Sequence, residues 1–173
     1  MEAALDRLFL DYSVENLRQR ASEIERCLAK LTNEQIWARG NENENAIGNL
    51  VLHVCGNVRQ RTAFAIQGKP DVRERDREFA ARAGASVSEL TDKLRQTVDE
   101  AVASLGQVTA EMLSRRVRVQ GYDQTILEMI YHMVEHFALH TGQIVFATKA
   151  ITGEDLGFWR PPQPAAAAEQ SKV

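Results

Sequence analysis

The 173-residue sequence is poor in cysteine, in aromatic residues and in long apolar runs. Its two cysteines, Cys27 and Cys55, both fall in segments with helical periodicity, so we expect two small buried residues rather than a disulfide. No apolar run approaches the roughly 18 residues that a membrane-spanning helix needs. The first residues, Met1–Arg7, contain acidic side chains and no apolar segment, unlike a secretion signal. We therefore expect a cytoplasmic protein without a membrane partner.

The sequence also lacks a strong excess of either charge. Its 21 Lys and Arg residues against 24 Asp and Glu give a net charge of -3, which provides no general attraction to a polyanion, so we expect no nucleic-acid partner. Basic and acidic residues alternate over Arg73–Glu78, a pattern typical of a solvated loop. Arg115, Arg116 and Arg118 are denser and could line a groove, but plain solvation is the favoured interpretation.

Apolar residues recur at steps of three and four through most of the chain, which predicts helices. The first begins at Leu5, the third begins at Ser86, which forms a capping-box pattern with Glu89, and the fourth is capped by Asp123 or Thr125. Four helices are thus expected at about 5–33, 46–66, 86–106 and 125–151. This content favours an all-α four-helix bundle.

Three connecting or terminal segments do not fit this pattern. Residues 71–84 are charged and are interpreted as a loop with a helical turn. The segment Val108–Tyr122 alternates as a short strand would, but no partner strand is evident, so we expect an extended connector. Residues 160–173 are rich in proline and alanine and are expected to be disordered, which leaves a single domain over residues 1–159.

The four histidines are the most distinctive feature of the chain. His132, His136 and His140 are four residues apart, so a helix places them on one face with about 6 Å of rise between neighbours. The outer two are about 12 Å apart along the axis and cannot share one ion. An adjacent pair can, and His53, in the apolar stretch of the second helix, is the remaining histidine that could complete a three-nitrogen site.

Three neutral imidazoles suit zinc, nickel, iron or copper better than calcium or magnesium. Three protein ligands also leave a coordination position for water or substrate, which distinguishes a catalytic from a structural site. Gln143 and Asn57 follow histidines by three and four residues, so either could orient a ring or face the same cavity. The competing interpretation is that the histidines are hydrogen-bonded core residues that bind no metal.

Two segments resemble the DinB/YfiT-like superfamily. Residues 135–144, EHFALHTGQI, are similar to its His-x-x-x-His-x-Gly-Gln ending, and residues 47–57, IGNLVLHVCGN, are similar to its second-helix histidine segment. The order of the segments, and residues 152–158 after the last helix, extend the resemblance to about residue 159. The combination of the two segments is specific, whereas neither would be alone.

The resemblance implies an up-down-down-up bundle, often a homodimer, in which His53, His136 and His140 bind zinc or nickel. His132 matches no obligatory ligand. Characterised relatives include mycothiol-dependent maleylpyruvate isomerase and bacillithiol- or mycothiol-dependent S-transferases. The leading hypothesis is therefore a metal-dependent enzyme of the thiol S-transferase type, acting on a small-molecule substrate with a low-molecular-weight thiol. The alternatives are a metal-dependent hydrolase and a non-catalytic, stress-related metal-binding domain.

Overall fold

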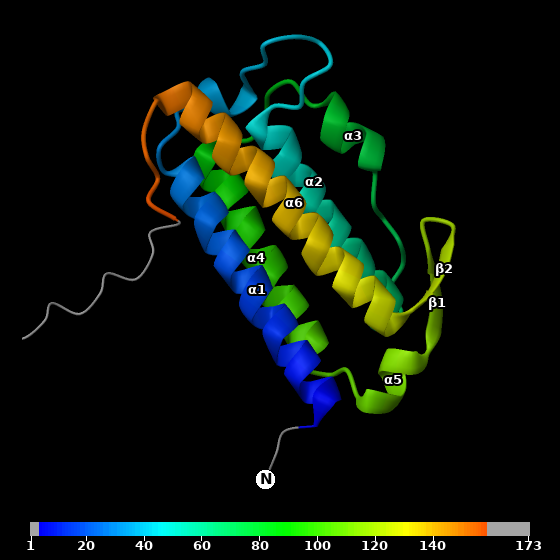
Figure 1. Cartoon of the computed structure of the whole chain (residues 1–173). Helices are drawn as coiled ribbons and strands as arrows, with labels where there is room; N and C mark the ends of the chain where they lie inside the picture. Colours follow the sequence, from blue (N-terminus) through cyan, green and yellow to red (C-terminus); the bar gives the residue numbers. More distant parts are fainter. Residues whose placement is uncertain (1–3, 159–173) are drawn as a thin grey trace, which may run out of the picture.

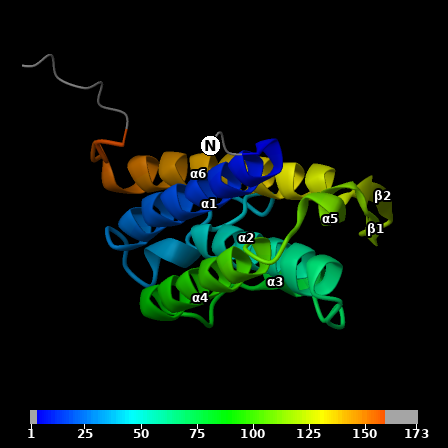
Figure 2. The same ribbon diagram turned by 90° about the horizontal axis from the view of Figure 1, so that it is seen from below.

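Four long helices form the body of the protein in the computed structural model, which describes residues 4–158. They are α1 (Leu5–Leu28), α2 (Ile47–Arg59), α4 (Val87–Leu105) and α6 (Ile126–Thr152). Helices α1 and α6 form one layer and α2 and α4 the other (Figure 2). Helices α1 and α6 run in one direction and helices α2 and α4 in the opposite direction (Figure 1), which confirms the up-down-down-up bundle. The Pro/Ala-rich tail and its expected disorder lie outside the described residues.

The ends of the helices follow the capping chemistry of the sequence. The Ser86 hydroxyl accepts a hydrogen bond from the Glu89 amide, and the Thr125 hydroxyl accepts one from the Glu128 amide. Thr125, not Asp123, is therefore the N-cap of α6. Gly153 ends that helix with a φ of 69°, a conformation that glycine adopts without strain.

Other boundaries differ in detail from the expected ones. Helix α1 ends at Leu28 rather than near residue 33 and is followed by the 3₁₀ turn η1 (Gln35–Trp37). Helix α2 continues without a break into a π-helical segment, η2 (Gln60–Ile66), so the second helical stretch extends as far as predicted. Its last part widens to the π form, which often marks functional sites.

Apolar side chains from all four long helices meet between the two layers. Fully buried examples are Leu17, Ile24, Leu94, Ile130 and Phe137. Both cysteines are free and belong to this core, as predicted, and burial raises the pKa of each thiol, that of Cys55 to about 11. Neither is therefore a thiolate at neutral pH.

The connector between α4 and α6 is not a lone extended segment, so that prediction is wrong. It contains a short helix, α5 (Ala110–Ser114), and an antiparallel hairpin of β1 (Arg116–Val119) and β2 (Tyr122–Thr125). Gln120 and Gly121 both have positive φ, 54° and 84°, as the favoured two-residue hairpin turns require. The partner strand lies in the residues just before α6, where only a helix cap was expected.

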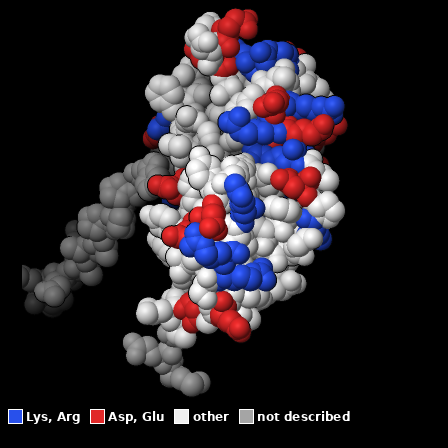
Figure 3. Space-filling view, turned by 90° about the vertical axis from the view of Figure 1, so that its right-hand side faces the viewer, with Lys and Arg blue, Asp and Glu red and all other residues white. Residues whose placement is uncertain are grey.

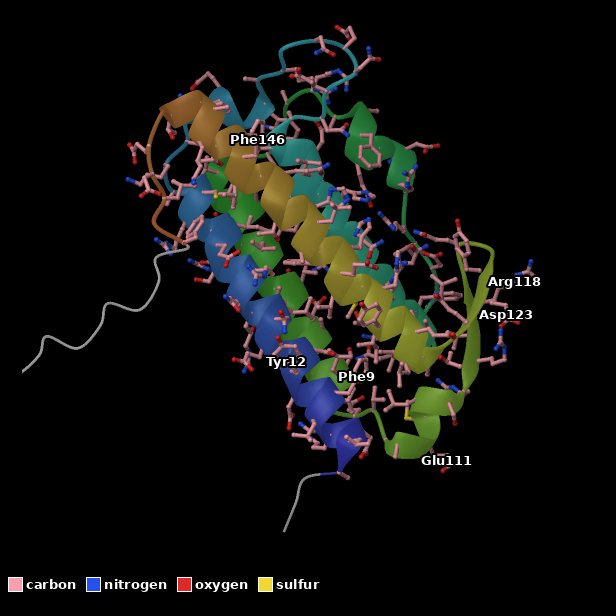
Figure 4. All side chains as sticks on the ribbon, viewed as in Figure 1. Phe9, Tyr12, Glu111, Arg118, Asp123 and Phe146 are labelled. Atoms are coloured by element: carbon pink, nitrogen blue, oxygen red, sulfur yellow. The ribbon has the colours of Figure 1, made fainter. Side chains whose placement is uncertain are left out.

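The hairpin has two unlike faces. Val117 lies opposite Gln124 and Val119 lies opposite Tyr122, so these four share the face that packs toward the bundle. Arg118 and Asp123 lie opposite each other on the outer face (Figure 4). Arg115, Arg116 and Arg118 are all exposed, which agrees with plain solvation rather than a groove.

The connection between α2 and α4 includes the short helix α3 (Arg75–Ala80), which packs on α2. This agrees with the expected loop with a helical turn. Within residues 4–158, no helix combines the length and the apolar character needed to cross a membrane.

Candidate metal centre

Three of the four histidines meet between α2 and α6. His53 projects from α2 and is buried, while His136 and His140 project from α6. Nε2 of His136 lies 3.2 Å from Nε2 of His53 and 3.2 Å from Nε2 of His140. One nitrogen from each ring lies within 4.8 Å of the other two, so the three could hold one ion.

His132 stays outside this triad. Its side chain is half exposed, and its Nδ1 lies 3.7 Å from a carboxylate oxygen of Glu135, which is itself exposed. The predicted division of the histidine row, with one adjacent pair meeting His53 and His132 as a neighbour, therefore agrees with the structure.

The spacing of the triad fits a tetrahedral ion. Zinc–nitrogen bonds of about 2.0–2.1 Å imply that two tetrahedral ligand nitrogens are separated by about 3.3–3.4 Å. The observed separations of 3.2 Å are close to this value. A single ring proton on His136 Nε2 can point at only one of its two neighbours, so hydrogen bonding among the rings does not satisfy all three nitrogens. A shared cation does.

Glu78 of α3 fixes the tautomer of His53. Its Oε2 lies 2.9 Å from His53 Nδ1, and a carboxylate oxygen this close must accept a proton from the ring. Nδ1 therefore carries the proton, which leaves the lone pair of Nε2 free for a metal. The Phe79 ring, 4.5 Å from the His53 ring between centroids, packs against the imidazole. The end of α3 thus both polarises and orients the His53 ring.

Glu78 is itself held by Arg73. Arg73 Nε donates to Oε1 and Nη2 donates to Oε2, both at 2.8 Å, in a bidentate pair. Burial raises the pKa of Glu78, but the hydrogen bonds and charges of Arg73 and His53 outweigh it and hold the pKa below its ordinary value. The carboxylate is therefore ionised at neutral pH and is a strong acceptor for His53.

This pair corrects the interpretation of Arg73–Glu78 as a solvated loop. Acidic and basic side chains are indeed interspersed on the face that carries α3 and the hairpin (Figure 3), and Glu74 pairs with Arg77 in the solvent. The side chains of Arg73 and Glu78, however, are only 4% and 11% exposed. The alternating charges therefore predicted the solvent-exposed residues correctly, but not Arg73 and Glu78, whose side chains turn toward α2.

Two residues of α2, Gly56 and Asn49, allow α3 to pack closely against this helix. A Cβ at Gly56 would overlap the Glu78 carboxylate, so only glycine lets that side chain lie against the helix. Asn49 is fully buried, and its amide nitrogen donates to the carbonyls of Glu78 and Ala81 at 2.8 and 2.9 Å. Both residues therefore position Glu78 behind His53.

The two histidines on α6 are supported by weaker hydrogen bonds than His53 is. His140 Nδ1 lies 2.7 Å from Gln143 Oε1, so the ring donates and its Nε2 is free. Gln143 thus lies beside His140, as its spacing suggested, and orients the ring by accepting the Nδ1 proton. The buried Nδ1 of His136 has no hydrogen-bond partner among the described residues.

The electrostatics of the pair on α6 favour neutral rings. Burial, followed by the nearby His140, His53 and Arg61 side chains, lowers the pKa of His136 to about 3. Burial also lowers the pKa of His140, against the opposing effect of its bond to Gln143. Neutral imidazole is the form that binds metals, so neither ring needs to lose a proton at neutral pH.

A cleft of about 390 Å³ opens beside the triad. Polar side chains of α2, η2, α3 and the inner face of the hairpin line it together with the histidines: Asn57, Arg61, Arg75, Gln120, Tyr122 and Gln124. Gln120 at the hairpin turn donates to the side chain of Gln60 at 2.8 Å, which joins the tip of the hairpin to the π-helical segment. The cleft is large enough for a small molecule next to a metal.

The sequence matches the family described as "Protein of unknown function (DUF1572)" over residues 4–161, almost its whole length. The chain belongs to this family. No curated protein shows significant similarity to it.

Solved structures resemble this member of the DUF1572 family over most of its length. A conserved protein from Enterococcus faecalis has a TM-score of 0.71 at 18% identity, covering 88% of this chain and all of that one. The DinB-like protein YjoA from Bacillus subtilis has a TM-score of 0.64 at 17% identity, covering 83% and 93%. A mycothiol-dependent maleylpyruvate isomerase has 0.61 at 16%, covering 82% and 68%. The resemblance to the DinB/YfiT-like superfamily is thus confirmed at the level of the fold.

Proposed function

We propose that this protein is a metal-dependent enzyme of the thiol S-transferase type, with His53, His136 and His140 as ligands to one zinc or nickel ion. The observation that carries the proposal is the meeting of three Nε2 atoms, with two of the three rings, those of His53 and His136, lining a polar cleft. A structural zinc site is normally closed by a fourth protein ligand. No fourth His, Cys, Asp or Glu joins the triad within the described residues, and a cleft lies beside it.

The residues around the triad have distinct tasks in this proposal. An ion held there supplies Lewis acidity, lowering the pKa of a thiol or water that binds its open position. Glu78 and Gln143 hold the His53 and His140 rings with their Nε2 atoms toward the centre. The cleft holds the electrophilic substrate beside it. The reacting thiol is a separate small molecule, because burial keeps Cys27 and Cys55 protonated and inside the core.

The structural likeness to a mycothiol-dependent isomerase supports a low-molecular-weight thiol as the cosubstrate. The test is turnover by protein purified without a histidine tag and loaded with zinc or with nickel. We expect saturable consumption of a thiol such as mycothiol or bacillithiol with at least one member of a panel of small electrophiles. The control is His136→Ala, which should abolish that turnover. Metal-loaded protein that is inactive with every thiol and electrophile pair would remove the transferase proposal.

The same experiment separates the two alternatives. A hydrolase would convert ester, amide or lactone substrates without a thiol, because the open position can also bind water. A non-catalytic metal-binding domain would hold one ion per chain and turn over neither class. The cleft beside the triad favours an enzyme over the second alternative.

The homodimer and the cytoplasmic location stay predictions, as do the boundary at residue 159 and the disordered tail.

Exposed apolar side chains on α1 and α6 support a dimer through this layer: Leu5, Leu8, Tyr12, Tyr131, Leu139 and Phe146. Figure 4 shows Tyr12 on α1 and Phe146 on α6. We expect Phe146→Glu to shift the molar mass measured by light scattering from that of a dimer to that of a monomer. If Phe146→Glu still has the molar mass of a dimer, this face is not the dimer interface.

A further inference from the structure

The cleft beside the triad contains polar groups that the histidines do not use. Arg61 is only 3% exposed, yet its Nε and Nη1 atoms have no hydrogen-bond partner, and no ion pair to its guanidinium occurs among residues 4–158. Asn57 is equally buried, and its Oδ1 also has no partner. Both residues line the cleft together with His53 and His136. A buried charge without a partner opposes folding, so such a group points to a ligand that completes it.

The helix arranges these groups in a row. His53, Asn57 and Arg61 are spaced four residues apart along α2 and η2, so they follow one another on one helix face from the triad outward. A molecule in the cleft with its reacting end at the triad therefore meets Asn57 next and Arg61 beyond it. The opposite wall is the inner face of the hairpin, with Tyr122 and Gln124.

We propose that Arg61 and Asn57 form a subsite for a carboxylate-bearing small molecule, whose carboxylate binds Arg61 and whose N–H or O–H group donates to Asn57. This inference rests on the proposed function, because it describes the substrate class of the same cleft. A guanidinium presents parallel N–H groups that match the two oxygens of a carboxylate. One buried guanidinium also balances one carboxylate. A phosphate has a third oxygen and a second charge, and the only other cation in the lining is the exposed Arg75.

The other arginines and hollows in the described part of the chain do not combine burial with a missing partner in this way. The buried side chain of Arg73 is paired with Glu78. Arg39 is only half-buried, and its Nη2 donates to the Asn49 side chain and to the Ala81 carbonyl. The hollow of about 400 Å³ between η2 and residues 70–74 has no comparable buried donor without a partner. Among residues 4–158, Arg61 is therefore the buried arginine that has neither a hydrogen bond nor an ion pair within the protein.

The test is an NMR titration of the full-length, isotopically labelled protein, following the Nε–H signal of Arg61, in zinc-loaded and zinc-free forms. The probes are N-acetylglycine, its neutral counterpart N-acetylglycinamide, and inorganic phosphate. We expect N-acetylglycine to shift the Arg61 signal and to bind in roughly the millimolar range. The neutral amide and phosphate should bind at least tenfold more weakly.

The matched variants are Arg61→Gln inside the cleft and Arg118→Gln on the outer face of the hairpin. Arg61→Gln should weaken N-acetylglycine at least tenfold, whereas Arg118→Gln should change its affinity less than twofold. Asn57→Leu should weaken N-acetylglycine severalfold. Should Arg61→Gln fold poorly, Arg61→Lys keeps the charge without the fork and should give intermediate binding.

Several outcomes overturn the subsite. One is an Arg61 signal that does not shift when N-acetylglycine is added, and another is equal affinity for phosphate. The third is binding that requires zinc and is unchanged in Arg61→Gln, because the carboxylate would then bind the ion instead of Arg61. Zinc content measured on the same samples separates the two proposals. Arg61-dependent binding by a chain that holds no zinc would leave the subsite standing and remove the metal-dependent function. A chain that binds zinc but no carboxylate would do the reverse.

Discussion

The two sides of the triad are built differently. On the α2 side, His53 is backed by a charged carboxylate, an arginine and the Phe79 ring. On the α6 side, His140 is backed by the exposed amide of Gln143, and the second nitrogen of His136 has no partner. His53 is therefore held more firmly than the two histidines of α6. An ionised, buried acceptor holds an imidazole more firmly than a neutral acceptor that water can replace.

This asymmetry also places the open side of the site. The buried ion pair of Arg73 and Glu78 closes the region behind His53, while His136 borders the cleft that the hairpin covers. The cleft reaches the His53 and His136 rings on the side away from this ion pair. If the triad holds an ion, we expect the firmly held His53 to fix its position.

Loss of a ligand is the largest effect that we expect, and it tests whether the two sides meet at one ion. Protein purified without a histidine tag should contain about one equivalent of a transition metal, and His53→Ala should contain less than about a tenth of this. His132→Ala is the matched control and should keep its metal. Elemental analysis of the three proteins measures this. A wild type below a tenth of an equivalent, unchanged by His53→Ala, would mean that the triad is a set of core histidines.

Removal of the charge behind His53 is the next largest effect. Glu78→Gln keeps an oxygen that can accept from Nδ1 but loses the negative charge and the ion pair with Arg73, so zinc affinity should fall about 10–100-fold. Glu74→Gln, in the exposed turn before α3, is the control and should leave affinity within about twofold. A chelator competition titration measures both. Equal affinities for the two variants would show that the carboxylate does not support the ligand.

Local spacing was sufficient to predict the four helices and a histidine pair on the last one. The choice of His136 and His140 as partners of His53 came from the family resemblance, because a contact between α2 and α6 is not a local property. Apolar periodicity, capping pairs such as Ser86 with Glu89, and histidines four residues apart are properties of single helices. Arg73, Glu78 and the hairpin could not be found this way, because their roles depend on which segment packs across α2. Two signals were nevertheless present: Gly56 inside an apolar helix, which indicates a close approach, and Gln120-Gly121, which suits a tight turn.

Gly56→Ala, which places a methyl group where the Glu78 carboxylate lies, should reduce zinc affinity less than Glu78→Gln does. Glycine inside a helix costs about 1 kcal/mol relative to alanine, so Gly142→Ala, with open space around the new Cβ, should raise the free energy of unfolding by up to about 1 kcal/mol. Gly56→Ala should lose this gain, because its Cβ displaces the Glu78 carboxylate. Zinc affinity should fall severalfold in Gly56→Ala alone. Urea unfolding and zinc titration of the pair measure both effects. Full affinity with added stability in Gly56→Ala would show that Glu78 does not need glycine at this position.

Removal of the acceptor behind His140 should have the smallest effect, and it tests the asymmetry most directly. Gln143 is exposed, so in Gln143→Ala a water molecule can accept the Nδ1 proton of His140 in its place. Zinc affinity should therefore fall by less than in Gly56→Ala, and by much less than in Glu78→Gln. The same chelator competition compares the two variants under one set of conditions. A loss in Gln143→Ala as large as that in Glu78→Gln would mean that both sides hold the ion equally, because orientation of the ring, rather than the charge behind it, would then set the affinity.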